Sequence, residues 1–141
     1  MTSNAVSGVG TQFKRAEGDS SAPTFTAISE INSISGPNMS RDTIDVTSLD
    51  STGGYREFIG GFRDGGELTM EMNFTIAGFD LMKDDFESAA LRDYQVVLSD
   101  TGNTTLEFAG LVTSLGLTVP MDDKITASVT IKISGEVTLT T

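Results

Sequence analysis

The sequence predicts a mainly β protein, an antiparallel β-sandwich or barrel with one flanking α-helix. Two stretches, residues 68–76 and 125–133, alternate apolar and polar side chains without interruption, which is typical of strands with one buried face. Short turn sequences such as residues 100–103 separate further apolar runs and favour antiparallel pairing. Only one stretch has the spacing of an amphipathic helix. We therefore expect about six to eight strands and one helix.

Length and residue types exclude most enzyme classes. We expect the 141 residues to form a single domain with its own core. Cysteine and histidine are both absent, which removes disulfides, the common nucleophiles and general bases, and the usual ligands of zinc, haem and iron–sulfur clusters. No run is long enough to span a membrane, and residues 1–10 lack the pattern of a signal peptide. We expect no catalytic residue, metal or cofactor, and no membrane partner.

The charge balance disfavours direct binding of nucleic acid. Twenty acidic and nine basic residues give a formal net charge of −11. Binding of nucleic acid usually depends on Lys and Arg side chains that neutralise phosphates. A solvated acidic surface and a surface that does not adhere to DNA are both consistent with this balance.

The first third of the sequence contains an arm, a loop and a strand. Residues 1–10 are small and polar and predict a flexible N-terminal arm. Residues 17–23 have the composition of a loop. Residues 24–34 predict a strand whose apolar positions slip out of phase, which indicates a bulge or an edge position.

A long excursion follows Gly36 and Pro37. Residues 38–66 are too many for a hairpin loop, and connections of this length are usually either functional or disordered. Within them, residues 43–47 alternate like a strand, and residues 50–54 have the composition of a mobile loop. The excursion is too apolar for a solvated tail, so we interpret it as ordered and buried against something. Its apolar residues are Ile44, Val46, Leu49, Tyr55, Phe58, Ile59 and Phe62.

The helix is expected at about residues 80–92. Phe79, Met82 and Phe86 fall on one face of it, Asp80 suits the N-cap, and Arg92 suits the last turn. The long apolar stretch at 105–119 changes side-chain parity at residues 109–110, which indicates a bulge. The final strand is interrupted at residue 135 and continues or ends there.

No motif for catalysis or phosphate binding is present. A pair of acids such as Glu71 and Glu107 is the type that cleaves glycosidic bonds, but nothing in the sequence brings the two together. The unusual features are a long ordered excursion, an N-terminal arm and an acidic composition. These are features of an assembly subunit.

Three runs resemble the major tail tube proteins of long-tailed, non-contractile bacteriophages. They are INSISGP at 31–37, IDVTSLDS at 44–51 and YREFIGGFRDGGE at 55–67. Residues 10–11, 120–123 and 131–135 are similar as well, so the resemblance covers nearly the whole chain, and its middle part is the most specific.

The resemblance implies a structural subunit without catalytic residues. Such subunits form hexameric rings whose inner strands make a continuous barrel, and the rings stack into a polymer around a tape-measure protein. A tail terminator and tail-tip proteins complete the tube, and DNA passes through its lumen. The resemblance therefore implies a place in the virion, with assembly in the cytoplasm of the host bacterium. By the same analogy, residues 38–66 make the contact between rings, and the N-terminal arm makes another.

Two sets of candidate residues follow from this resemblance. A strand that lines a lumen needs one polar face toward water, which the alternating stretch at 68–76 supplies, and an acidic lumen repels phosphate. The predicted lumen-facing residues are Thr69, Glu71, Asn73 and Thr75. The predicted inter-subunit contacts are Ile44, Val46, Tyr55, Arg56, Glu57, Phe58, Ile59, Phe62 and Arg63. Among these, the apolar side chains pack either on their own subunit or on a neighbouring ring.

Other functions remain open at the level of sequence. A tube subunit of a phage-derived bacteriocin or secretion system shares the expected fold. A monomeric β-sandwich binding module, such as an adhesin or a carbohydrate-binding domain, is a second class. Such a module usually presents an aromatic platform, whereas this chain has no tryptophan and two tyrosines. The oligomeric state separates these classes.

Overall fold

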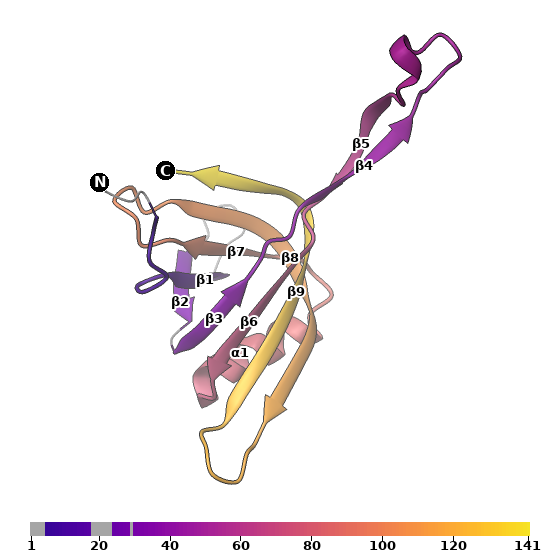
Figure 1. Ribbon diagram of the computed structural model, residues 1–141. Helices are drawn as coiled ribbons and strands as arrows, with labels where there is room; N and C mark the ends of the chain where they lie inside the picture. The colour runs from indigo at the N-terminus through magenta and orange to yellow at the C-terminus, as the bar shows by residue number, and fades with distance from the viewer. Residues whose placement is uncertain (1–4, 18–23, 29) are drawn as a thin grey trace.

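The computed structural model describes residues 5–17, 24–28 and 30–141. It is mainly β with one α-helix, as the sequence predicts (Figure 1). The arm expected at 1–10 and the loop expected at 17–23 lie partly outside the described residues. The elements are β1 Gln12–Glu17, β2 Thr24–Ile28, β3 Ile31–Ser35, β4 Ser40–Asp45, the 3-10 helix η1 Thr52–Gly54, β5 Phe58–Asp64, β6 Glu67–Asn73, α1 Ile76–Glu87, β7 Arg92–Val97, β8 Thr105–Thr118 and β9 Thr126–Thr140.

Seven strands form one antiparallel sheet in the order β2-β1-β7-β8-β9-β6-β3. β2 and β3 follow one another in the chain, yet they lie at opposite edges, so the sheet curves back on itself. The sequence predicted one strand over 24–34, which is wrong in count. The phase slip marks the passage between two edge strands, at Glu30 with a φ of 61°. These two edge strands do not pair with each other. An apolar groove lined by Ile31, Ile34 and Leu98 lies beside β3, and residues 8–11 form its other side.

The core lies on the inner face of the curved sheet, beneath α1. The two alternating stretches behave as predicted over most of their length, with Leu68, Met70 and Met72 of β6 buried opposite the apolar positions of β9. Each such side chain contributes about 1.5–3 kcal/mol on burial. The buried cluster consists of Phe13, Ile28, Leu68, Met70, Met72, Met82, Tyr94, Val96, Phe108, Val112, Ala127, Val129, Ile131 and Ile133.

The helix begins and ends earlier than its periodicity suggested. α1 spans Ile76–Glu87 rather than about 80–92, and its N-cap is Thr75 rather than Asp80. The Thr75 hydroxyl accepts a hydrogen bond from the amide of Gly78 at 3.1 Å. This cap ends the preceding extended segment, because a capping threonine satisfies an amide of the first helical turn. Arg92 lies in β7 instead of the last helical turn.

The bulge predicted near residues 109–110 is confirmed. The register of β8 on β9 shifts between Glu107 and Ala109, and again between Val112 and Ser114. β9 continues through Gly135, whose φ of 88° suits glycine, so the strand bends there without ending. No helix in the described ranges is long and apolar enough to cross a membrane.

Candidate assembly surfaces

The excursion after β3 forms a separate two-stranded hairpin of β4 and β5 that projects from one end of the sheet (Figure 1). It is regular structure rather than loop, and residues 52–54 form η1 at its tip. All of β4 is exposed, and only Gly61 of β5 is half-buried. The apolar side chains of the hairpin therefore do not pack on their own subunit. Ile44, Val46, Phe58, Ile59 and Phe62 are each between 44% and 90% exposed.

Hydrogen bonds within the hairpin hold its tip in place. The amide of Glu57 donates to the Thr47 hydroxyl at 2.7 Å, and the amide of Thr47 donates to Asp45 at 2.8 Å. These bonds from Thr47, together with one from Arg56, hold the pKa of Asp45 below its ordinary value. The Ser51 hydroxyl donates to Glu57 at 3.1 Å. The hydrogen bonds that order the tip therefore come from residues of the hairpin itself.

A bulge separates the hairpin into an apolar face and a charged face. Ile44 pairs with Ile59, whereas Arg41 pairs with Arg63 after a register shift at Asp42. Phe62 adjoins Arg63 in an extended strand and so points to the side of Ile44 and Ile59. A Cβ added to Gly60 would lie 3.2 Å from Cδ of Arg41, which agrees with this assignment. We call Ile44, Val46, Ile59 and Phe62 the apolar hairpin face; Phe58 lies on the charged side.

The base of the hairpin is closed by contacts with β9. The amide of Gly66 donates to Asp64 at 2.8 Å, the amide of Ile133 donates to the carbonyl of Gly66 at 3.0 Å, and Lys132 lies 3.3 Å from Asp64. These interactions with Gly66 and Lys132 lower the pKa of Asp64. They fix the direction in which the hairpin leaves the sheet.

Gly66→Ala is expected to disturb the hairpin base. Gly66 has a φ of 77°, and an added Cβ would collide with the backbone carbonyl of Asn38. Alanine at such a position typically destabilises by more than about 1 kcal/mol. We expect a lower denaturation midpoint and less assembly. Gly102→Ala, where an added Cβ meets nothing within 4 Å, is the matched control. Equal stability of the two variants would contradict this account.

The outer face of β6 carries the predicted lumen residues. Thr69 and Glu71 are exposed and Asn73 is half-buried, and all three point away from the core. Thr69 pairs with Thr130 of β9 and Ser35 of β3, and Glu71 pairs with Ser128 and Ser33. Small hydroxyl side chains therefore surround one carboxylate. Thr75 does not belong to this face, because it caps α1 after β6 has ended at Asn73.

A buried ionic cluster connects α1 to the neighbouring strands β1 and β7. Asp85 of α1, whose side chain is 2% exposed, accepts from Arg15 at 2.7 Å through both oxygens, from Tyr94 at 2.8 Å, and from Arg92 at 2.6 Å. The hydrogen bonds that Arg15 donates to Asp85 raise the pKa of Arg15. Burial, and then the negative charge of Asp85, raise the pKa of Tyr94. Arg92 also donates to the Ala16 carbonyl at 2.7 Å.

This cluster was not foreseen from the sequence. Asp85 stands in a run of exposed acids, and nothing in the sequence distinguishes it from Asp84. Within the described ranges, no buried side-chain nitrogen or oxygen lacks a hydrogen-bond partner, and no group of acidic residues is arranged to hold a metal ion. The cluster is therefore structural: it holds the helix over the core.

Unpaired strand edges, a helix on one face of the sheet and an exposed apolar hairpin define a β-structured assembly subunit. A family model described as "Lambda phage tail tube protein, TTP" matches residues 7–140. The chain therefore belongs to this tail tube protein family, as its sequence resemblance indicated. No curated protein matches the chain significantly in sequence.

Solved tail structures share the fold. A chain in the tail of an empty gene transfer agent particle with C6 symmetry is 21% identical, with a TM-score of 0.77 over 97% of this chain and 100% of that one. A chain in the virion of a native gene transfer agent is 24% identical, with a TM-score of 0.74 over 97% and 100%. The SPP1 tail tube is 9% identical, with a TM-score of 0.70 over 94% and 78%.

Proposed function

We propose that this tail tube protein assembles into hexameric rings that stack into a hollow homopolymer. The observation that carries the proposal is the projecting hairpin, whose apolar face is exposed in the single subunit. An exposed apolar patch of this kind usually marks an interaction site. Family membership and the C6 symmetry of the similar gene transfer agent tail support the six-fold arrangement.

Contacts within a ring use the unpaired strand edges. β3 has a free edge, and β8 pairs with β7 only as far as Gly110, which leaves one edge of residues 111–118 free among the described residues. Pairing of these two edges between neighbouring copies would extend the sheet around the ring. A closed barrel of this kind removes the edges that otherwise invite uncontrolled association.

Contacts between rings use the hairpin. The proposed contact residues are all exposed, and they lie on β4, on β5 or at the tip of the hairpin. Residues of both the apolar and the charged side are included. They are Ile44, Val46, Tyr55, Arg56, Glu57, Phe58, Ile59, Phe62 and Arg63. Arg56 lies 3.3 Å from Asp45 of its own subunit, and an exposed pair of this kind contributes only about 0–1 kcal/mol. The apolar hairpin face therefore supplies more of the stacking energy.

The polar face of β6 would line the lumen. Thr69, Glu71 and Asn73 lie among serine and threonine side chains of β3 and β9. The described residues of β3, β6 and β9 include no arginine and one lysine, Lys132, which forms an ion pair with Asp64. Such a surface has few cationic side chains, so it binds the phosphates of passing DNA only weakly. The net charge of −11 acts in the same direction.

Glu71→Lys is expected to slow the passage of DNA. The substitution places six cations per ring in the lumen if the arrangement proposed here holds, and lysine holds phosphate. The rate of DNA release from particles carrying the variant measures the effect, with Glu71→Gln as the control for loss of charge alone. A normal release rate with Glu71→Lys would contradict the lumen assignment.

The remaining partners follow from this role. We propose that the tube encloses a tape-measure protein, ends at a terminator and tail-tip proteins, and assembles in the cytoplasm of the host bacterium without any enzymatic activity or membrane partner. A similar chain occurs in an extracellular contractile injection system, in its sheath–tube complex. A tube subunit of such a phage-derived particle is therefore the second candidate function.

Negative-stain electron microscopy with sedimentation velocity tests the proposal. Purified protein at increasing concentration should pass from monomers to rings or hollow tubes, with an annular cross-section. A protein that stays monomeric at all concentrations, including in the presence of preformed tail tips, would refute it. Binding of a glycan by that monomer would instead support a binding module.

A further inference from the structure

A groove lies at the base of the hairpin, and Arg63, one of the proposed contact residues, lines it. It has a volume of about 720 Å³ and lies between the hairpin and the end of β9. Met39 and Val137 give it an apolar lining, and Arg41 and Arg63, on the charged side of the hairpin, give it positive charge. Asp64 and Glu136 also line it, and Asp64 is engaged by Lys132 and Gly66.

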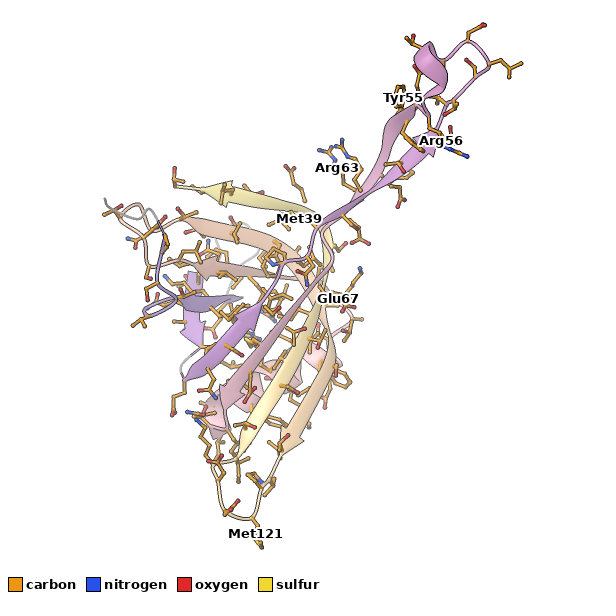
Figure 2. All side chains as sticks on the ribbon, viewed as in Figure 1. Met39, Tyr55, Arg56, Arg63, Glu67 and Met121 are labelled. Atoms are coloured by element: carbon orange, nitrogen blue, oxygen red, sulfur yellow. The ribbon has the colours of Figure 1, made fainter. Side chains whose placement is uncertain are left out.

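Arg41 and Arg63 have no partner among the residues that the structure describes. Arg41 and Arg63 stand directly opposite one another on β4 and β5, an arrangement in which like charges destabilise a sheet. Both are exposed, and neither has a hydrogen bond or an ion pair among the described residues. Figure 2 shows Arg63 projecting away from the hairpin. Guanidinium groups favour carboxylates, so the groove is suited to an acidic ligand with an apolar part.

The β8–β9 turn at the opposite end of the same sheet has that chemistry. Its Met121 is fully exposed and is followed by Asp122, Asp123 and Lys124, all exposed. Asp123 accepts a hydrogen bond from the amide of Lys124, and Asp122 has no hydrogen bond or ion pair with any other described residue. The pairing of β6 with β9 runs from Glu67 and Lys132 near the hairpin to Asn73 and Thr126 near the turn. Met121 therefore lies at the far end of the molecule from Met39 (Figure 2).

We propose that the groove at the hairpin base receives the β8–β9 turn of a second copy of this chain. Met121 enters the apolar part, Asp122 and Asp123 face Arg41 and Arg63, and Lys124 faces Glu136. The groove thus presents two arginines and the carboxylate of Glu136. The turn presents two aspartates and one lysine, which are the complementary charges. The inference rests on the proposed stacking and gives it a polarity, because two different surfaces at opposite ends make a head-to-tail contact that repeats along an axis.

Charge reversal tests this contact. Arg41→Glu/Arg63→Glu and Asp122→Arg/Asp123→Arg should each raise the critical concentration for assembly about tenfold or more, because each places like charges across the contact. The variant that combines all four substitutions should recover assembly to within about threefold of the unaltered protein. Equal assembly of the two double variants and the unaltered protein would overturn the proposal, and so would a combined variant no better than either double variant.

Two controls separate the contact from folding and from net charge. Arg41→Glu/Arg63→Glu replaces one like-charge pair by another, so the hairpin itself should keep its stability, which denaturant unfolding measures. Asp80→Arg/Asp84→Arg on the exposed side of α1 changes the net charge as much as Asp122→Arg/Asp123→Arg does. This control should leave the critical concentration unchanged.

A cross-linking experiment distinguishes failure of this contact from failure of the tube. The chain has no cysteine, so Met39→Cys and Met121→Cys proteins each carry one thiol. When the two are mixed, one of them with a mass tag, oxidation should give mainly mixed dimers. Tubes without mixed dimers, or homodimers in equal yield, would overturn the contact while the proposed tube stands. Mixed dimers without tubes would support the contact and count against the tube.

Discussion

Asp85→Asn is expected to lower the free energy of unfolding by about 3–5 kcal/mol, because it leaves buried arginine without its counter-charge. The side chain of Arg15 is 7% exposed and has Asp85 as its nearest carboxylate, at 2.7 Å, with Glu17 farther away at 3.3 Å. Asparagine has the size of aspartate but can accept through only one oxygen, so it satisfies neither the charge nor the paired bonds.

Denaturant unfolding measures this effect, and Asp84→Asn is the control. Asp84 is the exposed neighbour of Asp85 on α1, and its replacement should change stability by less than about 0.5 kcal/mol. We also expect Asp85→Asn to loosen α1, with faster amide hydrogen exchange there than in β9. A variant as stable as the unaltered protein would show that the cluster does not hold the helix.

Phe62→Ala is expected to prevent tube formation while the monomer keeps its stability. Phe62 is 90% exposed in the single subunit, so its truncation should change the free energy of unfolding by less than about 0.5 kcal/mol. An aromatic side chain at the centre of an interface often contributes about 2 kcal/mol or more to association. Phe58→Ala, on the charged side of the hairpin, is also expected to leave a folded monomer that does not form tubes.

Phe62→Leu is the matched control for this prediction. Leucine keeps an apolar side chain on the hairpin face, so some assembly should remain, whereas Phe62→Ala should show none at the same concentration. Electron microscopy counts tubes, and sedimentation velocity gives the fraction of monomer. An unchanged yield of tubes with both Phe62→Ala and Phe58→Ala would remove the hairpin from the proposed contact between rings.

The sequence predicted the strands best where burial alternates on a strict period of two. Met70 and Met72 of β6, and Val129 and Ile131 of β9, are buried as their positions required. The helix limits were missed because the alternation appeared to continue to Ile76, so that Thr75 read as a strand residue. Whether a threonine caps a helix depends on the backbone conformation at that residue, and spacing does not reveal it.

The sequence predicted the candidate contact residues as a group, but it did not predict on which face of the hairpin each side chain lies. Phe58 and Phe62, four residues apart, would share a face in a regular strand, and the bulge opposite Asp42 places them on opposite sides. Arg41 was not among the predicted contacts, although its cross-strand partner Arg63 was. Pairing across strands joins residues distant in the sequence, so it follows from the register and not from local pattern.

By itself, the sequence determined the fold class, the absence of histidine and cysteine chemistry, the ordered excursion and the tail tube family, because these follow from composition, period and motif. Only the tertiary structure decided which surfaces are free. It joined Arg15, Asp85, Arg92 and Tyr94 into one buried cluster, and it placed the hairpin base and the β8–β9 turn at opposite ends of one sheet. Both results depend on contacts between residues far apart in the chain, and local sequence propensity does not predict such contacts.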